Sequence, residues 1–380
     1  MNNFIFQNPT RLIFGKGMIA QLPNEIPAEK NIMITFGGGS VKKNGIYDQV
    51  MEALKGYKTT EFWGIEPNPS IETLRKAIEL GKEKKIDFLL AVGGGSVLDG
   101  TKLISAGLLY DGDAWDLVKK GSSTETIPMG TVLTIPATGS EMNNGAVISR
   151  HETSEKYPFY SSYPVFSILD PTVTFSLPPY QIACGMADTF VHVMEQYMTK
   201  TNQSRVMDRW AEGILMMLTT IAPLIKENPQ DYDLMSQFML GATMGLNGFI
   251  GMGVPQDWAT HMIGHELTAL KGITHGASLA IVYPGMLRTL FEKKHDKLLQ
   301  YGERVWGIST GLPDSRAHMA IDKTEEFFRS LGLATHLSEA GIGDDVIDEI
   351  ERRFNERHAA YGEDGDVTGA VARQILLNCK

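Results

Sequence analysis

Three of the nine histidines fall within fifteen positions of the sequence, and imidazoles grouped in this way suit a divalent metal such as zinc or ferrous iron. His261 and His265 stand four positions apart in a segment of good helix formers without proline, a spacing that puts both rings on one face of a helix. An expected helix end at Lys271 and Gly272 lets the chain fold back, so that His275 can approach the same face.

A second segment supplies the carboxylate that such a site needs. Asp188 and His192 stand four apart on another expected helix, so one carboxylate and two or three imidazoles could surround a cation and keep a position open for substrate. A zinc-peptidase motif is excluded, because His265 and Glu266 are not followed by the second histidine of an HExxH helix. The alternative is that each histidine is a hydrogen-bonded structural residue, and the grouping of the pairs favours a metal.

The composition excludes several classes of function. At 380 residues the chain is too long for one ordinary core and predicts two domains. A formal charge of −10 argues against a nucleic-acid partner or an anionic membrane surface, and no apolar run is long enough to span a bilayer. The polar opening of the sequence is unlike a signal peptide, so a cytoplasmic location is expected. The only cysteines, Cys184 and Cys379, exclude a disulfide framework and a cysteine-ligated zinc site.

The first half of the sequence alternates apolar strands with helices. The apolar run 31–36 ends in Gly-Gly-Gly-Ser, and the run 87–92 is followed by the same four residues before an expected helix. Between them lies a helix expected from about residue 71 to residue 85, which Ser70 can cap. This alternation predicts a parallel sheet covered by helices on both faces, an architecture that binds nucleotides at the carboxyl ends of its strands.

The second glycine run, Gly93 to Ser96, is the predicted binding site for a pyrophosphate. Glycines after a strand let the backbone approach phosphate oxygens, and the amides at the start of the next helix hold the negative charge. A tight turn without a ligand would also explain either run alone, and no glycine stands three positions after Gly95 as in the usual dinucleotide fingerprint. In the segment 131–141 another strand ends in small hydroxyl residues, where Thr138 can bond to phosphate or to the nicotinamide amide.

The first run, Gly37 to Ser40, favours NADP over NAD. Sheets that bind NAD commonly place an acidic residue near the end of a strand to hold the ribose 2′-hydroxyl. This strand end has none, and Lys42 and Lys43 follow it, so two cations can attract a 2′-phosphate. The alternative is that both lysines only lie on a solvated helix surface.

Strand-like runs nearly vanish after the Ser-Leu-Pro-Pro stretch at 176–179, and amphipathic helical patterns follow one another. We therefore expect an α/β dinucleotide-binding domain at 1–178, with a parallel sheet flanked by helices, and an all-helical metal-binding domain at 179–380. The candidate carboxylate and histidines all fall in the helical domain.

Taken together, these residues resemble the iron-containing (group III) alcohol dehydrogenase family, and most closely its bacterial NADP-dependent butanol dehydrogenase or aldehyde reductase branch. The similarity covers almost the whole chain. It lies in the ordered motifs PTRLIFGKG, GGGSVLDGTK, ATGSE, LDP with SLPP, GMxDxxxHxxE, and HxxxH followed ten positions later by His-Gly. The resemblance implies a dehydroquinate synthase-like architecture.

The resemblance also implies roles for individual residues. Asp188, His192, His261 and His275 would bind the metal, which leaves His265 close to the nicotinamide and the substrate as the catalytic residue. The family pattern implies cofactor contacts at Gly94, Gly95, Ser96, Asp99, Thr138, Lys156 and Leu177, to which we add Gly37, Gly38 and Ser40 of the first run.

Two positions depart from the family pattern. Ala137 replaces the first glycine of the usual Gly-Thr-Gly-Ser-Glu motif. Many relatives carry Asp in the first strand turn, where this chain has the run from Gly37 to Ser40. The second departure argues against NAD and agrees with the preference for NADP inferred from the residues.

The expected reaction is reversible hydride transfer between NADP(H) and a small primary alcohol or aldehyde, of the butanol dehydrogenase or broad aldehyde reductase type. One divalent metal, Fe²⁺ or Zn²⁺, would polarise the carbonyl oxygen, and a relay through water, the ribose hydroxyl or His265 would deliver the proton. The Asp-His₃ set accepts both metals, so the sequence leaves the metal open. The resemblance further suggests a homodimer.

Two other functions share parts of this pattern. A dehydroquinate synthase-like lyase that acts on a sugar phosphate with bound NAD would need several cations near the histidines, where only Lys271 is found. A non-catalytic nucleotide sensor would not require metal ligands in this order.

Overall fold

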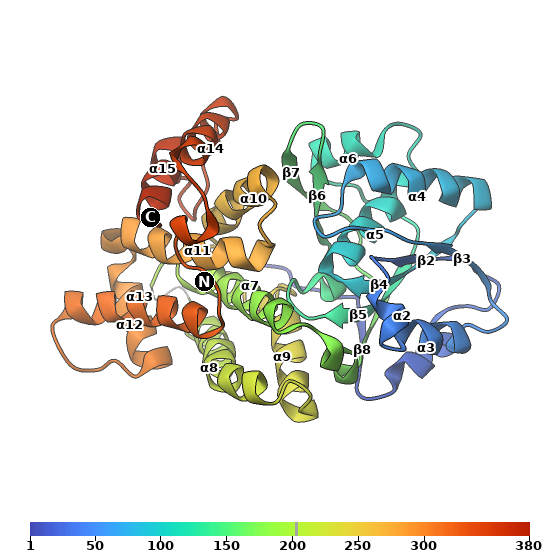
Figure 1. The fold of residues 1–380 in the computed structure, drawn as a ribbon, viewed down its shortest axis with the longest axis horizontal. Coiled ribbons are helices and arrows are strands. Elements are labelled where there is room, and N and C mark those ends of the chain that lie inside the picture. The colour runs from blue at the N-terminus through green and yellow to red at the C-terminus, as the bar shows by residue number, and fades with distance from the viewer. Residues whose placement is uncertain (202–203) are drawn as a thin grey trace. The chain divides into compact units, whose positions relative to one another are not determined.

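The computed structural model of the chain describes residues 1–201 and 204–380, and it comprises two compact units (Figure 1). The α/β unit consists of residues 7–178 and 229–243, and the helical unit consists of residues 1–6, 179–228 and 244–380. One border between the units lies between Pro178 and Pro179. A single boundary at this point would place residues 1–6 in the α/β unit and residues 229–243 in the helical unit, but each segment belongs to the other unit.

A six-stranded parallel sheet forms the centre of the α/β unit. Its strands follow the order β1-β8-β5-β4-β2-β3, and every neighbouring pair is parallel. The strands are β1 (Arg11–Phe14), β2 (Asn31–Phe36), β3 (Lys58–Phe62), β4 (Phe88–Gly94), β5 (Met129–Ile135) and β8 (Phe166–Leu169). The predicted parallel sheet is confirmed.

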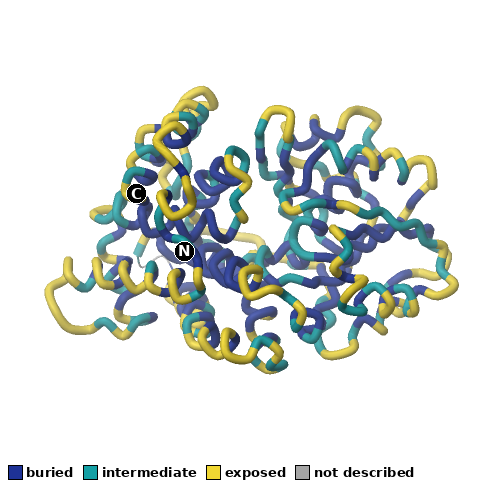
Figure 2. Tube along the Cα trace, viewed as in Figure 1, coloured by how far each residue is buried: buried dark blue, intermediate teal, exposed yellow. Residues whose placement is uncertain are grey.

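Helices cover the sheet on both sides; in Figure 1, α4 and α5 lie on one side of the strands and α2 and α3 on the other. Because the sheet is covered on both faces, all six residues of β2 are buried, and most of them are apolar (Figure 2). A separate antiparallel hairpin pairs β6 (Gly145–Arg150) with β7 (Glu155–Tyr160). The helices of this unit are α1 (Leu22–Glu25), α2 (Ser40–Lys43), α3 (Ile46–Ala53), α4 (Ile71–Lys84), α5 (Gly95–Gly107), α6 (Ala114–Lys120) and most of α9 (Tyr232–Gly245).

The register of the sheet brings the two glycine runs to one edge. Thr35 pairs with Ala91 and Phe36 pairs with Val92, so Gly37, which follows β2, comes at the same level as Gly93, which lies near the end of β4. The expected helix between them is α4, and Ser70 Oγ accepts a hydrogen bond from the amide of Thr73 at 3.4 Å.

The helical unit is built around α7 (Pro179–Tyr197) and α11 (His275–Thr289), which pack against each other and are buried along most of their lengths. The start of α11 lies directly on the backbone of α7, because a Cβ atom at Gly276 would clash with the carbonyl oxygen of Cys184. The other helices are α8 (Arg205–Glu227), α10 (Ala259–Lys271), α12 (Phe291–Trp306), α13 (Pro313–Ser330), α14 (Asp344–Glu356) and α15 (Gly369–Leu377).

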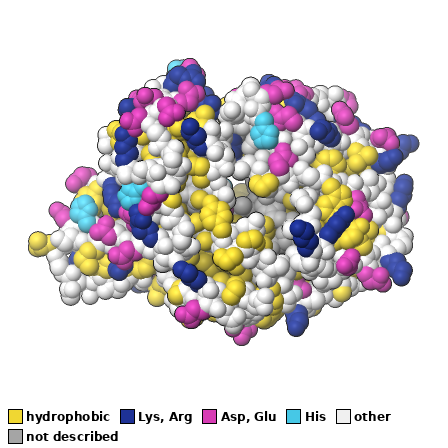
Figure 3. Space-filling model, viewed as in Figure 1, with side chains coloured by type: hydrophobic (Ala, Val, Ile, Leu, Met, Phe, Trp, Pro, Cys, Tyr) yellow, Lys and Arg dark blue, Asp and Glu magenta, His cyan; other side chains and the backbone are white. Residues whose placement is uncertain are grey.

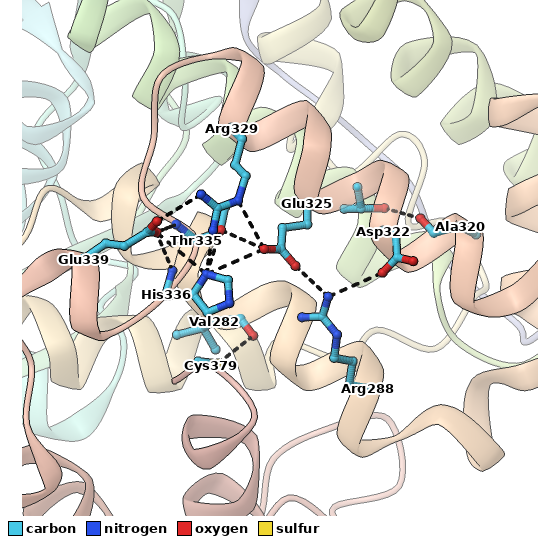
Figure 4. Close-up of polar contacts among 11 residues, drawn as sticks. Val282, Arg288, Ala320, Asp322, Glu325, Arg329, Thr335, His336, Glu339 and Cys379 are labelled. Atoms are coloured by element: carbon cyan, nitrogen blue, oxygen red, sulfur yellow. Dashed lines mark hydrogen bonds and ion pairs between the residues drawn. The ribbon is translucent and has the colours of Figure 1, made fainter.

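A polar network ties α11 to α13 and to the chain that follows it (Figure 4). Glu325 of α13 accepts hydrogen bonds from Arg288 at 2.6 Å, from Thr335 Oγ1 at 2.9 Å and from Arg329 at 3.3 Å. Arg329 also donates to Glu339 at 2.9 Å. These contacts anchor the last turn of α11 to α13.

Two further observations concern the surface of the described residues. Among them, no helix has both the length and the apolar character needed to cross a lipid bilayer. On the face of the molecule shown in Figure 3, acidic and basic side chains are intermixed.

Candidate metal centre and cofactor site

Three polar residues of α7 face the same way. Asp188, His192 and Glu195 occupy positions i, i+4 and i+7, which lie one above the other on a helix with 3.6 residues per turn. All three are at most 4 % exposed. Acidic and imidazole groups are rarely buried to this degree unless they are paired or bind a metal.

Three imidazoles surround one carboxylate oxygen. Asp188 Oδ1 lies 3.5 Å from His192 Nε2, 3.7 Å from His261 Nε2 and 3.6 Å from His275 Nε2. The rings come from α7, α10 and α11, so residues far apart in the sequence meet at one point. Ligands about 2.1 Å from a tetrahedral ion lie about 3.4 Å from one another, close to these separations.

The group fits a cation on two further grounds. The ligand atoms of Asp188, His261 and His275 all lie within 4.8 Å of one another. His261 Nε2 is buried and has no hydrogen-bond partner among the described residues, which is unfavourable unless something binds it. His192 lies outside this set of three, but its Nε2 is 3.5 Å from Asp188 Oδ1 and its ring stacks on that of His261 with the centroids 4.6 Å apart.

His265 lies one turn beyond His261 on α10. Its ring centroid is 5.1 Å from that of His275 and 6.4 Å from that of His261, so it borders the group without joining it. The side chain is 4 % exposed. An imidazole in this place is near enough to act on a molecule bound at the group of Asp188, His192, His261 and His275, which we call the Asp-His group.

The charges of the group influence one another. Burial by itself would lower the pKa of His261, but the carboxylates of Glu195 and Asp188 outweigh it and raise the pKa to about 9. Burial raises the pKa of the nearby Cys184 thiol to about 11. A thiol with such a pKa is protonated at neutral pH and is a poor nucleophile.

The second glycine run lies at the carboxyl edge of the sheet, between β4 and α5. A Cβ atom at Gly95 would lie 2.5 Å from Thr138 Oγ1, and one at Gly94 would lie 3.0 Å from Ile135 Cβ, so both positions require glycine for close packing. Helix α5 begins at Gly95 without a side-chain cap, which leaves its first amides available to an anion. The structure thus brings Gly94, Gly95, Ser96 and Thr138 together.

Asp99 and a buried lysine organise the loop that contains Thr138. Asp99 accepts hydrogen bonds from Ser140 Oγ at 2.6 Å and from the Val147 amide at 2.9 Å. Lys102 is 0 % exposed, and its Nζ donates to Ser140 Oγ at 2.8 Å, Asn143 Oδ1 at 3.1 Å and the Gly145 carbonyl at 2.6 Å. The sequence analysis included Lys102 in the motif GGGSVLDGTK but predicted no role for it, although its spacing of three from Asp99 puts both on one face of α5.

Ser96 and Lys156 share a partner. The amide of Asn68 donates to Ser96 Oγ at 3.2 Å, and Lys156 Nζ donates to Asn68 Oδ1 at 2.8 Å. Lys156 is 8 % exposed. This contact links the hairpin strand β7 to the start of α5.

The first glycine run differs from the second in being open. A Cβ atom at Gly38 would meet nothing within 4 Å, Gly38 and Ser40 are exposed, and Gly37 is half-buried. The Nζ of Lys42, which follows the run, lies 4.1 Å from the ring centroid of Trp63.

Leu177 stands apart from both glycine runs in the sequence. It follows the 3₁₀ helix Pro171–Ser176, its amide donates to the Thr174 carbonyl at 3.0 Å, and it is half-buried.

A parallel α/β unit with a glycine-rich carboxyl edge, in one chain with a helical unit that gathers an aspartate and three histidines, defines a metal-dependent oxidoreductase of dehydroquinate synthase-like architecture. Residues 9–171 match the family model for iron-containing alcohol dehydrogenase, and residues 182–363 match the model for the C-terminal part of the Fe-containing alcohol dehydrogenase family. The chain belongs to the iron-containing alcohol dehydrogenase family. The resemblance inferred from the sequence motifs is confirmed.

Individual relatives are similar to this chain over almost their whole lengths. The chain is 50 % identical to the NADPH-dependent aldehyde reductase YqhD of Escherichia coli (strain K12), with 99 % of both chains covered. It is 44 % identical to NADP-dependent alcohol dehydrogenase 3 of Entamoeba histolytica, with 99 % of this chain and 98 % of that one covered.

Solved structures of relatives show the same fold. The crystal structure of E. coli YqhD superposes with a TM-score of 0.98 over 100 % of this chain and 99 % of that one. NADH-dependent butanol dehydrogenase A of Thermotoga maritima, at 34 % identity, gives a TM-score of 0.94 over the same shares. The family assignment makes the chain an alcohol and aldehyde oxidoreductase, and it disfavours the sugar-phosphate lyase and the nucleotide sensor.

Proposed function

We propose that the protein is an NADP(H)-dependent aldehyde reductase and alcohol dehydrogenase for small primary alcohols and aldehydes, with one divalent metal at Asp188, His192, His261 and His275. The observation that carries the proposal is the position of three imidazole nitrogens 3.5 to 3.7 Å from Asp188 Oδ1. A carboxylate and three imidazoles suit Fe²⁺ and Zn²⁺ alike.

The metal and the cofactor bring the chemistry that amino acids lack. A cation held by the four residues acts as a Lewis acid on a carbonyl oxygen, and the nicotinamide supplies or accepts the hydride. The chain contributes orientation, exclusion of water and proton transfer. We assign proton transfer at the substrate oxygen to His265, directly or through water or a ribose hydroxyl, because its buried ring lies 5.1 Å from that of His275.

The proposed cofactor site uses backbone amides more than side chains. The first amides of α5, at Gly95 and Ser96, would bind the pyrophosphate, and Gly94 would let it approach the strand end. Thr138 and Lys156 would contact the cofactor from the loops around this edge, as would Asp99 and Leu177.

Two observations support NADP(H) over NAD(H). The first strand end, from Gly37 to Ser40, carries no acidic residue, and Lys42 and Lys43 follow it. The relatives that are 50 % and 44 % identical are named for NADPH and NADP, whereas butanol dehydrogenases that are 43 % identical or less are named for NADH.

We also propose that the enzyme is a cytoplasmic homodimer. The dimer is supported by the resemblance to the family, and the compartment by two buried cysteines that are free thiols. Light scattering coupled to gel filtration tests the dimer, with an expected mass of twice 41.9 kDa.

The metal site is tested by removing single ligands. Asp188→Ala and His275→Ala should each abolish both the metal content and the oxidation of NADPH that depends on butanal. His318→Ala is the matched control, since this histidine of the same unit stacks on Phe291 and should keep metal and activity. Full activity in either ligand variant without metal would refute the proposal.

A further inference from the structure

Helix α10 does not provide its own N-terminal cap. Its N-cap residue, Trp258, has a φ of 64° and no capping side-chain bond. The Ala259 amide donates instead to Asp257 Oδ1 at 3.0 Å, and the amides of Thr260 and His261 donate to Glu195 at 2.7 and 3.3 Å. Since the first amides of a helix need acceptors, a carboxylate from α7 closes the start of α10.

The same carboxylate binds the ring of a proposed metal ligand. Glu195 Oε2 contacts Nδ1 of His261, so this nitrogen is engaged by a carboxylate from the side opposite the Asp-His group. The other ring nitrogen, Nε2, faces Asp188 Oδ1 at 3.7 Å and has no partner among the described residues. A carboxylate on one nitrogen leaves the other as a lone-pair donor and raises its basicity.

A buried ionic cluster holds the segment before His261. The Asp257 amide donates to the Glu195 carbonyl at 2.9 Å. Asp257 Oδ2 pairs with Lys294 Nζ at 2.8 Å, and the same Nζ reaches Glu363 at 2.8 Å. Lys294, Asp257 and Glu363 side chains are at most 3 % exposed, so these bonds are shielded from water. The backbone at Trp258 is therefore fixed in its uncommon conformation from several directions.

We propose that Glu195 is a positioning residue that orients His261 and reserves its Nε2 for the metal. The inference rests on the proposed metal-dependent function. Capping alone would require contacts only to the amides of α10, whereas Glu195 also contacts the ring. Its place seven residues after Asp188, on the same face of α7, lets one helix carry two ligands and the support for a third.

The test uses two substitutions of Glu195 and one matched control. Glu195→Gln keeps the size and removes the charge, and Glu195→Asp keeps the charge on a shorter arm. The control is Glu212→Gln, because Glu212 is another buried carboxylate of this unit, and it is bonded to Tyr197 and Arg304 instead of to a proposed ligand. For each metal-free protein, the dissociation constants of Zn²⁺ and Co²⁺ are measured by competition with a chelator, and the visible spectrum of the Co²⁺ form is recorded.

Glu195→Gln should weaken binding of both metals by about 10- to 100-fold and change the Co²⁺ spectrum. Glu212→Gln should lower the melting temperature but keep wild-type metal affinity and spectrum. If Glu195→Gln fails to fold, Glu195→Asp decides, with a metal affinity expected below that of the wild type and a changed Co²⁺ spectrum. Wild-type affinity and spectrum in whichever Glu195 variant folds would overturn the inference. Failure of the wild-type protein to bind metal would refute the proposed function instead.

Discussion

The two candidate sites differ in how their polar groups are satisfied within the chain. At the carboxyl edge of the sheet, where the cofactor is proposed to bind (the cofactor edge), both oxygens of Asp99 accept protein hydrogen bonds and Lys102 donates three. In the Asp-His group, three imidazoles face one oxygen of Asp188, and His261 Nε2 has no partner among the described residues. The polar groups of the first site are therefore satisfied by the chain itself, whereas the second is the proposed site of a cation.

This difference predicts that metal removal affects one site only. Stripping the metal should lower aldehyde-dependent turnover by about a thousandfold or more, because several kcal/mol of transition-state stabilisation are lost. The metal-free protein should also have a lower free energy of unfolding than protein with metal present at about 100 times its dissociation constant, by about 2.7 kcal/mol. NADPH affinity, measured by titration calorimetry, should be unchanged. A large loss of NADPH affinity in the metal-free protein would show that the two sites are not independent of each other.

Lys102 offers the reverse experiment at the cofactor edge. Lys102→Met removes the donor that Lys102 provides to Ser140, Asn143 and Gly145, and should destabilise the protein by about 3 kcal/mol. NADPH binding should weaken because the loop around Thr138 loosens. Chemical denaturation and NADPH titration measure the two effects.

A buried lysine of the helical unit serves as the control for Lys102. Lys297 is 2 % exposed and pairs with Asp208 at 2.7 Å. Lys297→Met should also lower stability, but it should keep the NADPH affinity of the wild type. Weakened NADPH binding in both variants would show that general destabilisation, and not the loop, controls the cofactor edge.

Lys102 should also make the free energy of unfolding depend on pH. Burial lowers the pKa of Lys102 from 10.5 in the unfolded chain to about 8. Between these values the unfolded chain binds more protons than the folded one, so stability rises with pH. Relative to Lys102→Met, wild-type protein should gain up to about 3 kcal/mol from pH 8 to pH 10.5. A pH-independent difference between the two proteins would contradict this assignment.

Much of the fold could be predicted because it depends on local patterns. The repeat of apolar strand, glycine run and helix predicted the parallel sheet, and the spacing of Asp188 and His192 placed both on one face of α7. What the sequence did not reveal depends on contacts between distant residues. Lys294 lies 37 positions from Asp257 and 69 from Glu363, and no spacing rule connects such partners.

The division into units was also only partly visible in the sequence. A boundary at 178–179 follows from the change in pattern, but residues 1–6 and 229–243 join units by tertiary packing. Glu195 could have been found, since its spacing of i+7 from Asp188 marks the same helix face. It was noted only as the last residue of the motif GMxDxxxHxxE, and no role was predicted for it, because a glutamate on a helix is most often a surface residue.

The choice of cofactor gives the smallest expected effect. Replacing both Lys42 and Lys43 by alanine removes two cations near the proposed 2′-phosphate, and should lower kcat/KM for NADPH about tenfold through KM. Activity with NADH should stay the same, since NADH lacks that phosphate. The ratio of the two kcat/KM values measures the effect.

A second pair of adjacent lysines provides a control that distinguishes a local contact with the phosphate from an effect of the net charge. Lys119→Ala/Lys120→Ala removes the same charge from the end of α6 in the same unit, and should leave the ratio unchanged. The loss in the Lys42 and Lys43 variant should also shrink at high salt, because exposed charges are screened within about 10 Å at 0.1 M. An equal loss with NADH would mean that these lysines support the fold of the glycine run and not the recognition of the phosphate. In that case the preference for NADP would have to come from the open space at Gly38, where a Cβ atom meets nothing within 4 Å.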